Sequence, residues 1–214
     1  MKEKMKIDIV SDVVCPWCTI GFKRLEKAIL DLGLQDQVEI EWQPFELNPN
    51  MPSQGQDLQE HITEKYGATL EQQKKSQQQM IEAGEAVGFT FDYFDKMRMA
   101  NTFEAHILLE YAKYFGKQTE LKMRLTTAFF SERKDVSNRN ILKQALTDVG
   151  LNAEEALSKL DNQEIRKEVK TKEKYWQQLG VSAVPTIVFN RKNAVTGAQP
   201  VDVFKQVLSE LIAE

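Results

Sequence analysis

The sequence has few of the residues that build metal centres and disulfide frameworks. Its 214 residues include two cysteines, Cys15 and Cys18, and two histidines, His61 and His106. Because a structural zinc site takes about four ligands, every cysteine and histidine in the chain would have to converge on one ion. A chain of this length also buries a hydrophobic core without needing disulfide bonds. We therefore expect neither a metal ion nor a structural disulfide.

Long hydrophobic runs and an excess of positive charge are missing as well. The sequence contains no stretch of 18 or more apolar residues, which is the length needed to span a bilayer. Asp8 and Asp12 interrupt the apolar run near the N-terminus, whereas the core of a signal peptide is uninterrupted. The formal net charge of −4 disfavours nucleic-acid binding, and we interpret the basic stretch 113–122 as solvated helix faces. These features predict a globular cytoplasmic protein, monomeric or homodimeric, that binds neither membrane nor nucleic acid.

The two cysteines lie at the junction of two different sequence patterns. Residues 6–14 form a short β-branched run typical of a buried strand, and the segment Cys15-Pro16-Trp17-Cys18 follows directly. Apolar residues then recur at helical spacing up to Leu32, and Gly33 stands where a helix C-cap is expected. The sequence therefore predicts a strand, a turn that carries both cysteines, and a helix.

This placement favours thiol chemistry. Unpaired N–H groups and the positive end of the helix dipole lower the pKa of a thiol at a helix N-terminus. Pro16 suits the first helical turn, which makes Cys15 the exposed cap. We expect Cys15 to attack a disulfide and Cys18 to resolve the product. Half of a zinc site and a pair of inert buried cysteines are the alternatives.

The rest of the chain separates into three regions. Residues 38–44 alternate between apolar and polar side chains, which predicts a second strand, and a proline-containing loop follows. The middle of the chain shows helical stripes and no strand pattern, whereas residues 181–189 and 194–196 predict strands and residues 201–212 a helix. We predict an α/β domain from residues 1–50 and 165–214, interrupted by an all-helical domain over residues 51–164.

Several short segments of the sequence resemble those of a known family. The segment Val184-Pro185-Thr186 resembles the cis-proline strand of the thioredoxin superfamily, and of its DsbA-like branch in particular; an ordinary trans proline is the alternative. The chain also resembles the FrnE-type DsbA-like oxidoreductases in the blocks 11–18, 45–49, 101–106 and 196–199. The resemblance implies a thioredoxin-like fold with an inserted all-helical domain.

The resemblance also implies an activity, thiol-disulfide exchange through a mixed disulfide on Cys15. It implies no cofactor, with glutathione or another low-molecular-weight thiol as co-substrate, and protein or small-molecule disulfides as partners. Asn101 also suits a helix cap and His106 a packed, hydrogen-bonded position. The resemblance assigns Pro16, Val184, Pro185, Asn101 and His106 to substrate contact. We also expect the ring of Trp17 to offer substrate an apolar contact, with a packing role as the alternative.

Two other functions are compatible with the same fold. The 2-hydroxychromene-2-carboxylate isomerases and kappa-class glutathione transferases are similar to this chain, use glutathione, and typically carry serine where it has Cys15. A glutathione-dependent isomerase or transferase is therefore the first alternative, although the cysteine favours disulfide exchange. A redox-silent binding or chaperone-like protein is the second.

The residues near the cysteine pair affect its redox properties. DsbA carries a histidine between its cysteines, whereas Pro16 and Trp17 are uncharged, so we expect a more reducing pair than that of DsbA. Thioredoxin-like enzymes often have a buried carboxylate six residues before the first cysteine, but that position is Ile9. We expect Asp12 to shape the turn. The proton acceptor for Cys18 is left unassigned.

Overall fold

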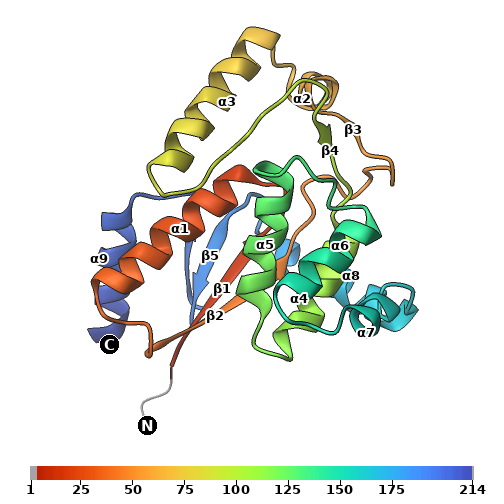
Figure 1. Ribbon diagram of the computed structural model, residues 1–214. Helices are drawn as coiled ribbons and strands as arrows, with labels where there is room; N and C mark the ends of the chain where they lie inside the picture. Colours follow the sequence, from red (N-terminus) through yellow and green to blue (C-terminus); the bar gives the residue numbers. More distant parts are fainter. Residues whose placement is uncertain (1–3, 214) are drawn as a thin grey trace.

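A four-stranded sheet forms the centre of the protein, seen in a computed structural model that describes residues 4–213 (Figure 1). Its strand order is β2-β1-β5-β6, with β1 (Met5–Ser11) parallel to β2 (Val38–Pro44). The strands β5 (Thr186–Phe189) and β6 (Asn193–Thr196) complete the sheet in antiparallel pairings. The helix α1 (Pro16–Asp31) links the parallel strands, which confirms the predicted strand, turn, helix and strand.

Both faces of the sheet are covered, which explains why the apolar residues Ile9 and Val10 stand at consecutive positions of β1. Ile7 and Ile9 pack with residues of α1 and α9 (Val201–Ala213), including Phe204. Val10 points to the other face, where it joins the cluster that contains Trp176. Because successive side chains of a strand alternate between its faces, a strand buried on both sides needs apolar residues at consecutive positions.

The insertion is helical with one small exception. Gln56 pairs with Met99 and Asp57 with Arg98 in a two-stranded ladder, so the prediction of no strand in the middle of the chain is wrong. Two-residue strands are too short to show an alternating pattern. From Gln56 to Gln178 the elements are β3 (Gln56–Asp57), α2 (Leu58–Tyr66), α3 (Leu70–Glu85), β4 (Arg98–Met99), α4 (Phe103–Lys113), α5 (Gln118–Phe130), α6 (Arg139–Asp148), α7 (Ala153–Ser158) and α8 (Gln163–Gln178).

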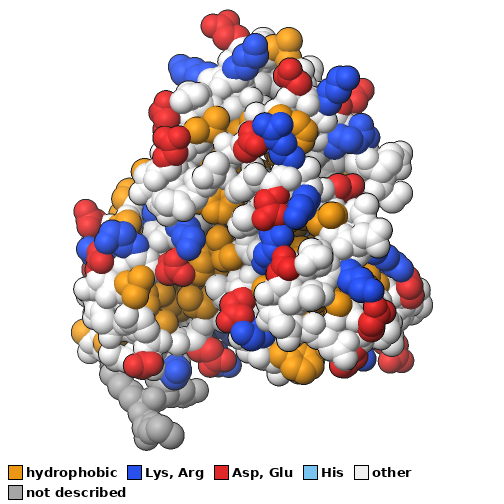
Figure 2. Space-filling model, in the orientation of Figure 1, with side chains coloured by type: hydrophobic (Ala, Val, Ile, Leu, Met, Phe, Trp, Pro, Cys, Tyr) orange, Lys and Arg blue, Asp and Glu red, His pale blue; other side chains and the backbone are white. Residues whose placement is uncertain are grey.

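The start of α1, with the two cysteines, lies where the sheet domain and the insertion meet. Val13, Val14 and Ile20 belong to the hydrophobic cluster of the insertion, and Met123 of α5 packs against the clusters of both parts. Hydrophobic side chains reach the surface in the hollow between α1 and α5 (Figure 2). None of the helices within residues 4–213 has the length and apolar character needed to cross a membrane.

The insertion is also attached to the sheet by a polar side chain. At the first position of α5, Gln118 accepts a hydrogen bond from the backbone N–H of Trp42 (2.8 Å) and donates one to its carbonyl oxygen (2.9 Å). Trp42 lies on β2, an edge strand, and its indole N–H donates to the Thr119 hydroxyl (2.9 Å). One turn of α5 is thereby fixed against the sheet edge.

Replacing this glutamine tests the attachment. Gln118→Ala leaves two buried backbone groups of Trp42 without their partners, so we expect the free energy of unfolding to fall by about 2 kcal/mol. Gln144→Ala is the control, because Gln144 makes an exposed bond within its own helix and should change stability by less than about 0.5 kcal/mol. Urea denaturation measures both. Equal effects of the two variants would contradict the attachment.

Candidate active site

The first cysteine caps α1. Cys15 is the N-cap residue with φ −99° and ψ 110°, Pro16 is at the first helical position, and the Cys18 N–H donates to the Cys15 carbonyl oxygen (3.1 Å). The Cys15 side chain itself makes no capping hydrogen bond within the described chain. Its sulfur is therefore left for other chemistry at the positive end of the helix dipole.

Burial in the site differs from the expectation in one respect. Cys15 is 4% exposed and Cys18 1%, so the prediction that Cys15 is an exposed cap is wrong, although the first cysteine is the more accessible one. The reason is the contact with the insertion, which buries the turn that leads to Cys15. A local sequence pattern does not reveal such a contact between distant segments. Trp17 is 41% exposed and is the open hydrophobic surface beside the pair.

The predicted strand-opening proline faces the cysteines. The bond between Val184 and Pro185 is cis, and the Val184 carbonyl oxygen lies 3.8 Å from the Cys15 sulfur. Gly21 permits this approach, because a Cβ at that position would lie 3.1 Å from Pro185 Cγ and 3.3 Å from Ala198 Cα. Pro185 is buried and Val184 half-buried. The structure thus brings Cys15, Cys18, Val184 and Pro185 together.

Asp12 holds the turn before the cysteines. Its carboxylate accepts hydrogen bonds from the backbone N–H of Val13 (2.7 Å) and of Leu47 (2.8 Å), which is the turn-shaping role expected of it. His106 Nε2 lies 3.3 Å from Asp12 Oδ1. Burial alone would raise the pKa of Asp12, but the hydrogen bond and charge of His106, with the Leu47 N–H and the charge of Lys122, hold it below its ordinary value.

Lys122 was not expected in the site. It lies on α5, 2% exposed, and its Nζ has no hydrogen-bond partner among residues 4–213. The interpretation of residues 113–122 as solvated is wrong at this position, because Lys122 faces the sheet domain one helical turn after Gln118. Burial lowers the pKa of Lys122, and the charges of Cys18, Asp12 and Cys15 oppose that shift. A lysine in a helix that also carries Glu120 and Arg124 leaves no signal of its own burial in the sequence.

Cys18 lies in the most desolvated part of the site. Burial raises the pKa of its thiol well above the ordinary value, and the hydrogen bond and charge of Cys15 add to the rise. The charge of Lys122 and a backbone hydrogen bond from Asp12 act in the opposite direction. Without help, the resolving thiol would be protonated near neutral pH.

Two of the predicted substrate-contact residues are hydrogen-bonded within the protein. His106 is 2% exposed and faces Asp12. Asn101 donates to the Met51 carbonyl (2.7 Å) and accepts from the Phe103 N–H (3.1 Å) at the start of α4, consistent with a capping role. Their contact with substrate stays a prediction. Tyr93, which the sequence analysis missed, lies near enough for the charge of Cys15 to add to the rise that burial causes in its pKa.

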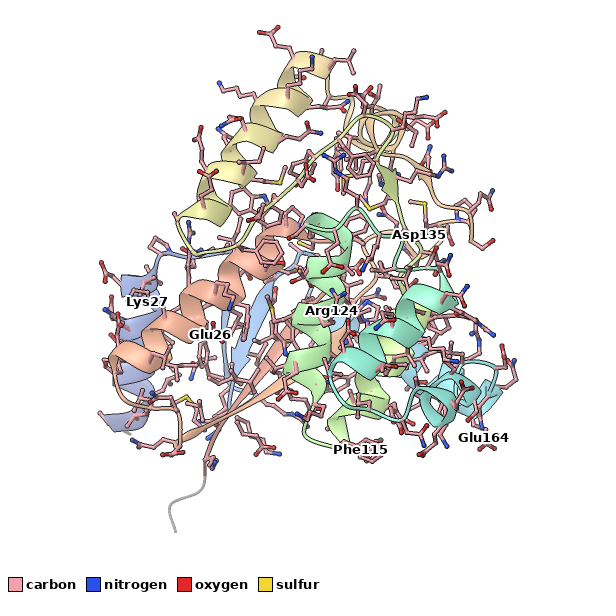
Figure 3. All side chains as sticks on the ribbon, viewed as in Figure 1. Glu26, Lys27, Phe115, Arg124, Asp135 and Glu164 are labelled. Carbon is pink, nitrogen blue, oxygen red and sulfur yellow. The ribbon has the colours of Figure 1, made fainter. Side chains whose placement is uncertain are left out.

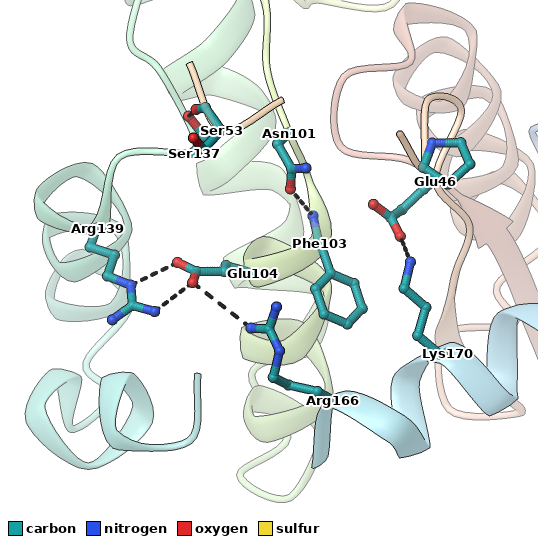
Figure 4. A pocket seen from close by; sticks show the side chains of 10 residues that line it. Glu46, Ser53, Asn101, Phe103, Glu104, Ser137, Arg139, Arg166 and Lys170 are labelled. Carbon is teal, nitrogen blue, oxygen red and sulfur yellow. Dashed lines mark hydrogen bonds and ion pairs between the residues drawn. The ribbon is translucent and has the colours of Figure 1, made fainter. Parts of the chain in front are cut away.

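Asn101 lines a cavity of about 520 Å³ that neither cysteine lines (Figure 4). Its three cations are all paired: Arg139 and Arg166 with Glu104, and Lys170 with Glu46. Burial raises the pKa of Glu46 to about 7, with a further rise from the Glu173 carboxylate and an opposing effect of Lys170. Elsewhere, no three His, Cys, Asp or Glu side chains of the described residues gather as a metal site would require.

The arrangement defines a thioredoxin-like protein with a Cys-X-X-Cys pair at the start of a helix and a cis-proline beside it. Comparison with known families makes this specific. The family model of the DsbA-like thioredoxin domain matches residues 6–209, so the chain belongs to that family. This confirms the resemblance to the DsbA-like branch and the predicted fold with a helical insertion; the FrnE type stays a prediction.

Three related proteins illustrate the similarity. A probable DsbA oxidoreductase from Streptomyces coelicolor, SCO1869, has 32% sequence identity and a TM-score of 0.91, covering 98% of this chain and 91% of that one. The uncharacterized protein YwbO of Bacillus subtilis strain 168 is 28% identical over 95% of this chain and 96% of its own length. The cytosolic disulfide reductase DsbM of Pseudomonas aeruginosa, solved with GSH, shares the fold with a TM-score of 0.66 and 15% identity, covering 98% of this chain and 100% of that one.

The raised pKa of Glu46 predicts a pH-dependent stability. The pKa of a glutamate in the unfolded chain is about 4.3, whereas that of folded Glu46 is raised to about 7. The wild type therefore loses stability as the pH rises through this interval. We expect Glu46→Gln to raise the melting temperature relative to the wild type at pH 8 and to lose that advantage at pH 4. Thermal unfolding monitored by circular dichroism measures it.

The control is Glu39→Gln, which changes an exposed glutamate on β2. Its difference from the wild type should be similar at both pH values. A Glu46→Gln difference that is equally independent of pH would contradict the assignment.

Proposed function

We propose that the protein is a thiol-disulfide oxidoreductase that acts through Cys15 and Cys18. The observation that supports this most is the position of the Cys15 sulfur at the start of α1, 3.8 Å from the Val184 carbonyl oxygen and beside cis-Pro185. A disulfide-containing segment lying along Val184 would bring one of its sulfur atoms to Cys15. Trp17, which is 41% exposed, offers such a substrate an apolar contact.

The reaction consists of two thiolate attacks. The Cys15 thiolate attacks a substrate sulfur, a Cys15–substrate disulfide forms, and the other substrate sulfur leaves as a thiolate. The Cys18 thiolate then attacks the Cys15 sulfur, forms the Cys15–Cys18 disulfide and releases the second substrate sulfur. Two electrons pass from the cysteine pair to the substrate, whose two thiolates take up protons from solvent. A thiol such as glutathione can reduce the pair again by the reverse steps.

A cytoplasmic reductase or isomerase is the role we favour. The uncharged dipeptide Pro16-Trp17 leaves the Cys15 thiolate without the charge that a neighbouring histidine would supply. DsbM, similar in fold, is described as cytosolic and as a disulfide reductase. Glutathione is a fitting co-substrate, because its thiol can enter a mixed disulfide with Cys15 without a further cofactor. A glutathione-dependent isomerase is less well supported, since a sulfur nucleophile stands at position 15 where those enzymes typically carry serine.

Two matched cysteine variants test the activity. We expect wild type to accelerate insulin reduction by glutathione, Cys15→Ser to show the uncatalysed rate, and Cys18→Ser to accumulate a mixed disulfide that mass spectrometry detects. Without Cys18, the first attack still occurs but the intramolecular release does not. Wild-type protein that leaves insulin oxidised yet isomerises or conjugates glutathione-linked substrates would establish the alternative. Inactivity in both assays would favour a binding protein.

The direction of electron flow is tested by the redox potential. We expect equilibration with glutathione buffers to give a value more negative than that of DsbA, which is about −120 mV. The ratio of reduced to oxidised protein is read after acid quenching and alkylation of the free thiols. A value as high as that of DsbA would contradict the reductase role and point to an oxidase.

A further inference from the structure

We propose that Lys122 accepts the proton of the Cys18 thiol when Cys18 resolves the mixed disulfide. The inference rests on the proposed function, and it fills the role that thioredoxin-like proteins often give to a carboxylate where this chain has Ile9. The lysine comes from the insertion and the cysteine from the sheet domain, so the two halves of the site belong to different parts of the fold.

The position of Lys122 is built into the packing of α5. Gln118, four residues earlier, is bound to the backbone of Trp42, and side chains four residues apart lie on the same helix face. Lys122 therefore faces the sheet too, with its Nζ 5.1 Å from the centroid of the Trp42 ring. The charged or titratable groups that act on it are Cys18, Asp12 and Cys15. A lone amine at such a place is costly to bury and calls for a functional explanation.

Two other titratable groups near the cysteines, Asp12 and Tyr93, are already engaged in hydrogen bonds. The Asp12 carboxylate accepts two backbone hydrogen bonds and faces His106 Nε2. Tyr93 donates its hydroxyl to the Met80 sulfur (3.3 Å). Among these groups in the described chain, the Lys122 amine alone has no hydrogen-bond partner. Of these three groups, the unpartnered Lys122 amine is therefore the one to which we assign the proton of Cys18.

Burial shifts the Lys122 amine toward the form that the step needs. It lowers the pKa of Lys122, which increases the share of the neutral amine, whose lone pair can accept a proton. The Cys18 S–H bond breaks, the proton moves to Lys122 Nζ, and the new thiolate attacks the Cys15 sulfur as the substrate thiolate leaves. The charge of the Asp12 carboxylate favours the ammonium, which returns the proton to Cys18 when the disulfide is reduced again.

Other cations on or near α5 show how unusual this position is. Arg124, which points toward the α6 side in Figure 3, donates to Asp148 (2.7 Å) and Glu132 (2.9 Å). Lys117, directly before the helix, pairs with Glu120 (2.5 Å). Both cations are stabilised by carboxylates at the surface. Lys117 is therefore a suitable control, because its removal changes the same charge without touching the cysteine pair.

The test separates the two sulfur attacks in one experiment. Reduced protein is mixed with excess dithiobis(nitrobenzoate) in a stopped-flow instrument, and release of the coloured thiolate is followed from pH 6 to pH 10. Attack by Cys15 releases one equivalent, and resolution by Cys18 releases the second. In Lys122→Met we expect the second phase to slow at least about tenfold at pH 7, within the range of general base catalysis, and to recover as the pH rises.

Each outcome bears on a separate claim. Lys117→Met should leave both phases unchanged, and thermal unfolding checks that each variant is folded; Lys122→Gln replaces the methionine variant if that one does not fold. A folded Lys122 variant whose second phase keeps the wild-type rate and pH profile would overturn the role of Lys122. If wild type releases no first equivalent, Cys15 is not reactive and the proposed function itself fails.

Discussion

The burial of the cysteine turn between two hydrophobic cores is the constraint on which the rest of the structure depends. Val13 and Val14 pack into the insertion, whereas Ile9, a few residues earlier, packs into the sheet domain. The chain therefore crosses from one core to the other immediately before Cys15. Because both cores fix this crossing, the sulfur atoms stay near the cis-proline on one side and the buried lysine on the other.

This constraint separates the properties of the two cysteines. Cys15 lies at the positive end of the α1 dipole and is slightly more exposed than Cys18. Cys18 has almost no exposed surface, so its ionisation depends on the few polar groups that the insertion and Asp12 provide. The uncharged dipeptide between the cysteines is thus only part of the electrostatic environment, and the remaining part comes from residues distant in sequence.

Local patterns in the sequence predicted most of the fold. The apolar spacing in α1, the alternation in β2 and the strand after Pro185 are properties of short segments, and each element was found within a few residues of its predicted place. The pairing of β3 with β4 could not be predicted, because two residues carry no period. The burial of Cys15 and Lys122 could not be predicted either, since it depends on contacts between segments that lie about a hundred residues apart.

The side chain of Gln118 has a consequence for association between molecules. By bonding both the N–H and the carbonyl of Trp42, its amide does what the backbone of a neighbouring strand would do at that position. A strand from another molecule could not pair with β2 at this position, because the backbone groups of Trp42 are already hydrogen-bonded and α5 covers the edge there. A helical insertion placed here therefore protects the sheet edge from intermolecular pairing while it completes the site.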